Sequence, residues 1–253
     1  MRIILLPLLF PLMAQAAEPI KPFQAEYELK RDQSNAGKVS LSLEYPKPGE
    51  YRFSSETKPV GLYKFFFQVI KESSAGVVVD NQFRPRNYRY IQKQSGDNRD
   101  MRMTFSTKPN RIKHKLNDKK PWYLKEPPKD VQDKMTQKLK LYQTFAADNK
   151  PPQTMQVADG GKLLKYRYEY VGKETINTPA GKFDTVKVLR HKGDKPPKVT
   201  LWLSEKLSYL PVRVDRKKGK KVFRMLLKAI RSDEKQIKSK KSSSRVKHVF
   251  ELH

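Results

Sequence analysis

The chain has 253 residues, of which 54 are Lys or Arg and 26 are Asp or Glu, so its formal net charge is +28 at pH 7. This length allows one large or two small domains. The chain contains no cysteine, which excludes disulfides, thiol catalysis, cysteine-ligated metal clusters and a lipid anchor on cysteine. Twelve Tyr and twelve Phe residues argue against disorder of the whole chain.

Residues 1–16 have the three parts of a secretory signal peptide. Arg2 supplies a positive charge, an apolar run of eleven residues extends from Ile3 to Met13, and Ala14-Gln15-Ala16 fits the small-x-small cleavage rule. The run is too short for a membrane span, which needs about 20 apolar residues. We therefore predict a mature chain that is exported to the periplasm, has no transmembrane segment and carries no lipid anchor.

Much of the mature chain alternates apolar and polar residues, as half-buried strands do. Residues 23–30 and 39–45 show this alternation on either side of a turn signal at 34–37, which predicts a hairpin. The dense apolar run Leu62–Ile70 fits either a strand or a short helix. Further strands are expected at residues 73–79, 86–94, 99–106, 111–116, 163–172, 183–190, 199–204, 211–216 and 221–230.

One segment has a helical period instead. Its apolar residues, spaced mostly three or four apart, are Val131, Met135, Leu139, Tyr142, Phe145 and Ala146. This spacing predicts a long amphipathic helix over about 130–147. A lone helix between two runs of strands favours a mainly β or α+β domain over residues 17–231, in which a curved, half-barrel-like antiparallel sheet packs around the helix.

The last part of the chain has a different composition. From Arg216 to Lys247 there are fourteen Lys or Arg residues and only two acids. High charge with low hydrophobicity predicts a disordered basic tail over residues 232–253. The basic residues that we expect to contact a polyanion are Arg216, Lys217, Lys218, Lys220, Lys221, Lys238, Lys240, Lys241, Arg245 and Lys247.

Several short motifs occur along the chain in a characteristic order. They are Glu72-Ser73-Ser74, Phe83-Arg84-Pro85, Tyr88-Arg89-Tyr90, Asp133, residues 178–184 (TPAGKFD), residues 201–204 (LWLS) and residues 209–212 (YLPV). Over about residues 22–231 the chain thereby resembles an exported bacterial family, domain of unknown function 3108. Thr136 stands where that family commonly has Ser. The resemblance implies a secreted, β-rich domain, similar to the half-barrels of periplasmic lipoprotein carriers, and it implies no activity.

The sequence contains no recognisable catalytic or metal-binding motif. Its four His residues are scattered, and no pair has the i, i+4 spacing that places two imidazoles on one helix face. We therefore expect no enzyme activity, no metal and no cofactor. Asp133 fits either a first-turn acid stabilised by the helix dipole or a carboxylate that faces a cavity.

The candidate ligand-binding residues are apolar. The helix stripe fits either core packing or one wall of a cavity of about 300–1,000 Å³, the usual size of a small-molecule site. Trp202 fits either a core residue or the floor of that cavity, and the aromatic run around Phe66 fits either the core or a mouth. The candidate residues are Met135, Leu139, Tyr142, Phe145, Trp202 and Phe66.

These features together suggest a non-enzymatic periplasmic binding protein. It would hold an apolar or lipid-like ligand and associate through its basic residues with anionic lipid or an envelope polymer. One alternative is an envelope scaffold that contacts a protein partner through Leu62–Ile70, and a weaker one is an envelope-polymer hydrolase. The basic charge also fits a lineage whose exported proteins are generally basic. Nucleic acid is not expected as a partner, because an exported protein seldom meets it.

Overall fold

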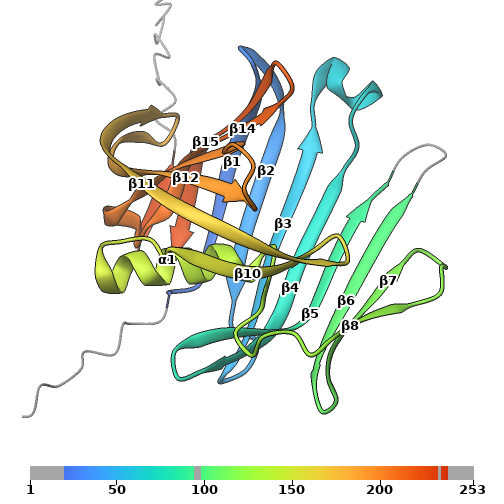
Figure 1. Ribbon diagram of the computed structural model, residues 1–253. Coiled ribbons are helices and arrows are strands. Elements are labelled where there is room, and N and C mark those ends of the chain that lie inside the picture. Colours follow the sequence, from blue (N-terminus) through green and yellow to red (C-terminus); the bar gives the residue numbers. More distant parts are fainter. Residues whose placement is uncertain (1–19, 94–97, 233–234, 239–253) are drawn as a thin grey trace, which may run out of the picture.

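The computed structural model describes residues 20–93, 98–232 and 235–238 (Figure 1). The predicted signal peptide, residues 1–16, lies outside these residues, as does most of the predicted tail. The described chain is mainly β and forms a curved, open sheet around one α-helix, which confirms the predicted fold class. Within the described residues, no helix has the length and apolar character of a membrane span.

The elements divide into two halves. The strands before the helix are β1 (Phe23–Arg31), β2 (Ser34–Glu44), β3 (Glu50–Pro59), β4 (Ile70–Val79), β5 (Gln82–Gln92), β6 (Arg99–Thr107), β7 (Asn110–Leu116), β8 (Trp122–Lys125) and β9 (Gln132–Asp133). The strands after it are β10 (Thr154–Asp159), β11 (Lys162–Thr178), β12 (Gly181–Lys192), β13 (Val199–Ser204), β14 (Leu210–Lys218), β15 (Lys221–Ser232) and β16 (Lys235–Lys238). The helices are α1 (Thr136–Asp148) and the 3-10 turns η1 (Gly61–Phe65) and η2 (Glu205–Leu207).

The two halves join through the first strand. The sheet order is β8-β7-β6-β5-β4-β3-β2-β1-β15-β14-β13-β12-β11-β10-β9, and β16 pairs with β15. β1 therefore lies between its sequence neighbour β2 and the distant β15, with Tyr27 opposite both Val39 and Leu227. Among the described pairs, only β9 and β10 run parallel.

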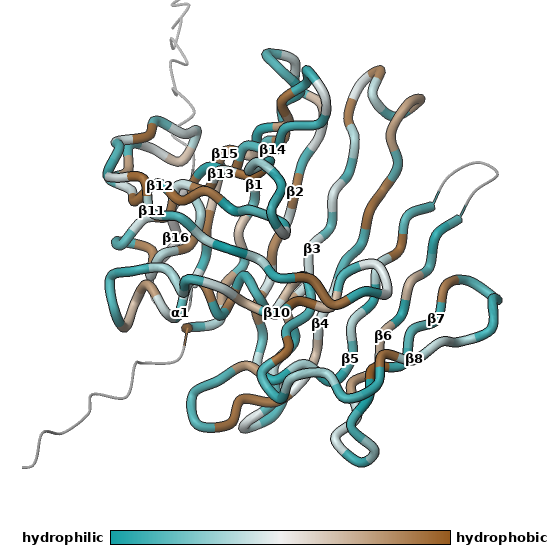
Figure 2. The backbone as a smooth tube through the Cα atoms, viewed as in Figure 1, coloured by the Kyte–Doolittle hydropathy of each residue, from teal (hydrophilic) through white to brown (hydrophobic). Residues whose placement is uncertain are grey.

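Alternating burial explains why these segments form strands. Phe23, Ala25 and Tyr27 on β1 are buried, whereas Gln24 and Glu26 between them are exposed. Successive side chains of a strand point to opposite faces, so one face of β1 lines the core and the other meets water. Figure 2 shows the same mixture of hydrophobic and hydrophilic residues along many strands.

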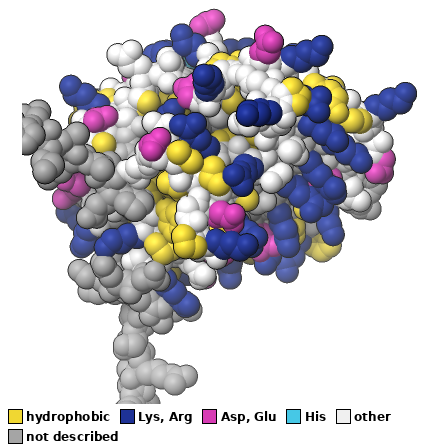
Figure 3. Space-filling model, turned by 90° about the horizontal axis from the view of Figure 1, so that it is seen from below, with side chains coloured by type: hydrophobic (Ala, Val, Ile, Leu, Met, Phe, Trp, Pro, Cys, Tyr) yellow, Lys and Arg dark blue, Asp and Glu magenta, His cyan; other side chains and the backbone are white. Residues whose placement is uncertain are grey.

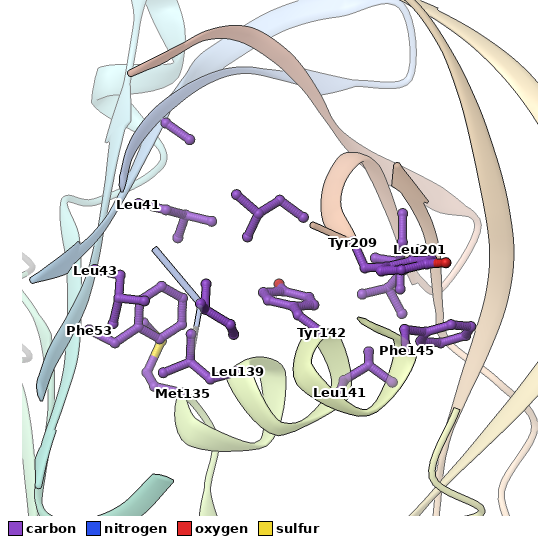
Figure 4. Close-up of a cluster of buried hydrophobic side chains, with 14 of the residues drawn as sticks. Leu41, Leu43, Phe53, Met135, Leu139, Leu141, Tyr142, Phe145, Leu201 and Tyr209 are labelled. Carbon is purple, nitrogen blue, oxygen red and sulfur yellow. The ribbon is translucent and has the colours of Figure 1, made fainter. Parts of the chain in front are cut away.

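The core lies between the two halves of the sheet, and α1 fills it. Figure 4 shows Leu139 and Tyr142 of α1 between Leu41 and Leu43 of β2 on one side and Leu201 of β13 on the other. All of these side chains are buried. Because the sheet curls around the helix, α1 contributes buried residues from more than one of its sides.

The helix is shorter than the sequence predicted. It has 13 residues and begins at Thr136, whereas the apolar pattern suggested a long helix from about residue 130. The preceding Gln132 and Asp133 are taken up by β9, which pairs with β10. The apolar spacing continues through this segment because Val131 and Met135 also face the core, so hydrophobic periodicity alone did not locate the start of the helix.

The region around residue 232 also differs from the expectation. β15 extends through Ser232, and Lys235–Lys238 of the predicted tail forms β16 by pairing with it. The short strands β8 and β10, which were not predicted, are likewise held by their partners in the sheet. The run Leu62–Ile70 forms η1 and a connection leading into β4.

A glycine allows β4 and β5 to approach each other behind the core. A Cβ atom at Gly76 would collide with the carbonyl oxygen of Arg84 and lie 2.9 Å from the ring of Tyr51. The register of β4 and β5 shifts at this point, between Ala75 and Gly76. Both contacts involve atoms with little freedom to move, so a larger residue would displace the strand pair.

We predict that Gly76→Ala lowers the free energy of unfolding by about 3 kcal/mol or more, as overpacking of a rigid core does. Gly219→Ala is the matched control, because its Cβ would meet no atom within 4 Å and its φ of +61° costs only about 1–2 kcal/mol for a side chain. Urea unfolding of the two variants measures the difference, and equal losses would contradict the close approach at Gly76.

Candidate functional site

A buried carboxylate fixes the start of α1 to β4. The Asp133 side chain is 0% exposed, and its Oδ1 accepts the backbone N–H groups of Met135 at 2.7 Å and Thr136 at 2.8 Å. Its Oδ2 accepts the hydroxyl of Ser74 at 2.5 Å, and that hydroxyl oxygen lies 3.1 Å from the Tyr51 hydroxyl. We call Asp133, Ser74 and Tyr51 the helix anchor.

Burial dominates the electrostatics of the helix anchor. It raises the pKa of Asp133 to about 6, although the hydrogen bonds from Ser74 and from the backbone of Thr136 and Met135 act in the opposite direction. Both carboxylate oxygens are engaged by groups of the protein itself. The carboxylate therefore satisfies two N–H groups at the helix start, which otherwise lack partners inside the helix.

A cluster of charged groups lies beside the helix anchor. Glu72 of β4 accepts the Tyr88 hydroxyl at 2.6 Å and pairs with the Lys134 ammonium at 3.2 Å. The Lys134 ammonium also lies 5.1 Å from the centre of the Tyr90 ring. Burial disfavours the charge on Glu72, yet the ammonium groups of Lys134 and Lys138 hold its pKa below the ordinary value. We call Glu72, Lys134, Lys138 and Arg190 the concave cluster.

Lys138 is the unusual member of the concave cluster. It is half-buried, and the only hydrogen-bond partner of its ammonium group among the described residues is the sulfur of Met135, 3.2 Å from Nζ. A thioether is a weak acceptor. Burial lowers the pKa of Lys138, and the nearby charges of Lys134 and Arg190 lower it further, against the opposing effect of Glu72.

Arg190 of β12 adds a further positive charge. Its guanidinium lies 5.0 Å from the centre of the Tyr166 ring, and it has no carboxylate partner in the described part of the chain. Asp159 is engaged elsewhere, since it accepts Lys192 at 2.6 Å and the Tyr166 hydroxyl at 2.9 Å. Lys134 pairs with the Glu72 carboxylate, and Lys138 is affected by the carboxylates of Glu72 and Asp133, the second of which is already engaged in the helix anchor.

A row of apolar residues lies beside the core on the concave side of the sheet. Leu29 of β1 is opposite Met225 of β15, which is opposite Val214 of β14. Directly opposed residues share a face of the sheet, and all three are half-buried against the core. Tyr90 also packs against the core, and the Lys134 ammonium lies 5.1 Å from the centre of its ring. We call Leu29, Val214 and Met225 the apolar row.

The predicted ligand-binding residues do not form one site. Met135, Leu139, Tyr142 and Phe145 lie together and are fully buried in the core around α1 (Figure 4). Their side chains are enclosed by both halves of the sheet, so they contribute to core packing.

The other two predicted residues differ from each other. Trp202 of β13 is 4% exposed and belongs to the same buried cluster, although its polar edge meets charged residues. Its Nε1 donates to Glu174 at 2.8 Å, and the Arg213 guanidinium lies 4.1 Å from the centre of its ring. Phe66 follows η1 and is 75% exposed, far from burial in the core or in a closed mouth.

The predicted polyanion-binding residues fall into two groups. Arg216, Lys217, Lys218, Lys220 and Lys221 lie in and beside the turn between β14 and β15, and all five are exposed. Lys238 belongs to β16, and Lys240, Lys241, Arg245 and Lys247 lie outside the described residues. Figure 3 shows Lys and Arg side chains spread over the face seen from below as well, so basic charge extends over much of the molecule.

Sequence reasoning missed the concave cluster. In the sequence, Lys134 and Lys138 stand out only as residues outside the apolar stripe, and Arg190 only as the end of a strand. The available signal was the pair of lysines four residues apart, which would share one face of the helix predicted over about residues 130–147. Their meeting with Glu72 and Arg190 depends on the curvature of the sheet, which local patterns do not encode.

The fold and the site define a class of β-rich proteins with a curved, open sheet, one enclosed helix and a charged concave face. The chain belongs to the family described as protein of unknown function DUF3108, which matches residues 26–228. This confirms the resemblance seen in the sequence. No curated protein matches the chain.

One solved structure supports the fold. The chain is similar to a β-barrel-like protein of domain of unknown function DUF1849 from Brucella abortus, with a TM-score of 0.56 and 12% identity over 86% of this chain and 100% of that one. A protein described as exported, with a YmcC-like fold, from Bacteroides fragilis gives a TM-score of 0.30 and 13% identity over 85% of this chain and 97% of that one. The second likeness is too weak to support an argument.

The helix anchor predicts a specific pH dependence. Asp133 titrates at about 6 in the folded protein and near 3.8 without its surroundings, so between these pH values the folded state binds the proton more tightly. The free energy of unfolding should therefore fall by about 2.4 kcal/mol between pH 4 and pH 7 through this group alone. Asp133→Asn retains the Oδ1 acceptor and cannot titrate.

Urea unfolding of both proteins from pH 4 to pH 7 measures this contribution as the difference between their pH profiles. All other titrating groups are common to the two proteins and cancel in that difference. Parallel profiles would contradict the raised pKa of Asp133.

Proposed function

We propose that the protein is a non-enzymatic, exported binding protein that holds an anionic amphiphile on its concave face. The observation that carries this proposal is Lys138, a half-buried ammonium whose only described hydrogen-bond partner is a thioether. A buried charge without a hydrogen-bonding counter-group is costly. A ligand with an acidic head group would supply an oxygen acceptor for it.

The surroundings of Lys138 favour a ligand that is an anion. Lys134 and Arg190 lie close enough to lower the pKa of Lys138, and the carboxylates of Glu72 and Asp133 oppose this effect. An anionic head group placed among these cations would form charge-assisted hydrogen bonds, which are stronger than neutral ones. It would also raise the pKa of Lys138 towards its ordinary value.

The apolar row supports the proposal that the ligand also has an apolar part. Leu29, Val214 and Met225 are half-buried beside the core, against which Tyr90 also packs, and the Tyr90 ring lies 5.1 Å from the Lys134 ammonium of the concave cluster. An acyl chain laid along this row would remove apolar surface from water, at about 25 cal/mol per Å². A head group and a chain together describe a lipid-like ligand.

A binding role also fits the helix anchor. Asp133 has both oxygens engaged by the protein, as expected of a carboxylate that positions α1. Export to the periplasm through residues 1–16 remains part of the proposal, as does association of the basic chain with anionic envelope material.

Titration with dodecyl phosphate below its micellar concentration tests the proposal. Isothermal calorimetry on the full chain should detect binding, and dodecanol should bind more weakly because it lacks the anionic group. Lys138→Met keeps the length of the side chain and removes its charge, so we expect the affinity for dodecyl phosphate to fall about tenfold to hundredfold.

Lys140→Met is the matched control for that titration. Lys140 lies on the same helix and pairs with Asp130 at 3.7 Å, outside the concave cluster, so its loss should leave the affinity unchanged. Equal affinities of wild type and Lys138→Met, or equal binding of dodecyl phosphate and dodecanol, would contradict the proposed site.

A further inference from the structure

The connection between β3 and β4 exposes an apolar tip. Leu62, Phe65 and Phe66 are 76%, 81% and 75% exposed, more than any other large hydrophobic residue in the described chain. All three belong to η1 or follow it directly. Figure 2 shows the hydrophobic colour at this projecting connection, and Figure 1 shows it at one end of the sheet. We call these three residues the apolar tip.

The base of the tip is well packed, although its outer residues contact little. The rings of Tyr63 and Phe67 lie 5.6 Å apart, and Phe67 meets Phe223 of β15 edge-on at 6.0 Å. The Arg31 guanidinium lies 5.7 Å from the centre of the Phe67 ring. The backbone N–H of Phe67 donates to the carbonyl of Tyr63 at 2.8 Å. The structure therefore holds the apolar tip outward on an ordered base.

Lysines surround the tip. A hollow of about 560 Å³ beside it is lined by Phe65 and Phe66, and its charged lining residues are Lys58, Lys64 and Lys93. Lys58 pairs with Glu56 at 2.7 Å, whereas Lys64 and Lys93 have no acidic partner among the described residues. These two lysines therefore leave uncompensated positive charge beside the apolar residues.

A second group of lysines lies at the same end of the sheet. Phe223, which contacts the base of the tip, lies near the start of β15, next to the turn that carries Lys217, Lys218, Lys220 and Lys221. Figure 1 shows the β14–β15 hairpin and η1 at the same end. We call this set of exposed lysines, together with the apolar tip, the rim.

We infer that the rim docks on the surface of an anionic lipid bilayer. Leu62, Phe65 and Phe66 enter the boundary between head groups and acyl chains, while the lysines of the rim remain among the phosphates. Exposed Leu and Phe residues flanked by lysines are what an interfacial segment needs, because apolar burial and attraction to anionic lipid act together. The inference concerns a different surface from the concave cluster and does not depend on the proposed ligand.

The positive charge around the apolar tip favours a lipid surface, rather than a protein, as the binding partner of the rim. The core of a protein interface is usually depleted of Lys, whereas lysines on long side chains reach phosphates at the level of the head groups while their stems lie on apolar surface. Lys58, Lys64 and Lys93 line the hollow beside the apolar tip together with Phe65 and Phe66. A bilayer meets both parts of this pattern at once.

Sedimentation with vesicles tests the inference on the full chain. Vesicles of phosphatidylcholine mixed with phosphatidylglycerol should bind the protein, and vesicles of phosphatidylcholine alone should bind it weakly. The double variant Phe65→Ser, Phe66→Ser should weaken binding about tenfold or more. Replacement of Lys217 and Lys218 by Gln should weaken binding about fivefold for each residue and reduce its dependence on salt.

Val171→Ser is the matched control, because Val171 is an apolar residue exposed by 49% on β11, outside the rim. It should bind vesicles as the wild type does. Binding of the double Phe variant at wild-type strength would overturn the inference, since it would place the contact elsewhere, for example in the basic tail. The inference would also be overturned if the wild type failed to bind mixed vesicles and instead captured a protein through the tip. That result would indicate a protein interface.

A fluorescent variant reports insertion without relying on loss of binding. Phe66→Trp keeps an aromatic residue at the exposed position, and its emission, after subtraction of the wild-type signal, should shift to shorter wavelength on mixed vesicles. Brominated acyl chains should quench the emission of this indole. An unshifted and unquenched signal from the bound Phe66→Trp variant would contradict entry of the tip into the bilayer.

Discussion

A sheet that curls without closing must fill its concave side, and in this protein α1 does so. Leu139 and Tyr142 occupy the space between β2 and β13, and the pairing of β1 with β15 joins the halves that face each other across the helix. Asp133 fixes where α1 begins, because its carboxylate connects the first helical N–H groups to Ser74 of β4. The position of the helix therefore depends on one buried, hydrogen-bonded charge, which is stable only while its partners are in place.

The same arrangement places positive charge inside the curve of the sheet. Once Asp133 sets the start of α1, Lys134 and Lys138 are directed away from the apolar side of the helix, towards Glu72 and Arg190. The helix thus fills the apolar part of the concave side, and Lys138 on α1 and Lys134 just before it add positive charge to the rest. We propose that the concave cluster binds the head group of an anionic ligand. The rim would bring the protein to the lipid surface from which such an amphiphile comes.

Local sequence patterns predicted the parts of the fold that depend on neighbouring residues. The alternation in β1 and β2 and the apolar spacing in α1 are of this kind, as is the mainly β class. β8 and β10 were not predicted, because these short strands are stabilised by partners in the sheet. The aromatic run near Phe66 was expected in a core or a mouth, but hydrophobicity alone cannot separate buried segments from an exposed tip. The concave cluster draws on β4, α1 and β12, which only the curvature brings together.

The central claim is that Lys138 is a half-buried ammonium that binds an anion, and its own titration tests this most directly. Nuclear magnetic resonance of lysine-labelled full-length protein, with Lys138→Arg to assign the signal, gives its pKa. We predict a value below those of the other lysines, because burial and the neighbouring cations disfavour its charge, and a rise when dodecyl phosphate is added. A Lys138 signal that titrates with the exposed lysines, and does not respond to the amphiphile, would contradict the account.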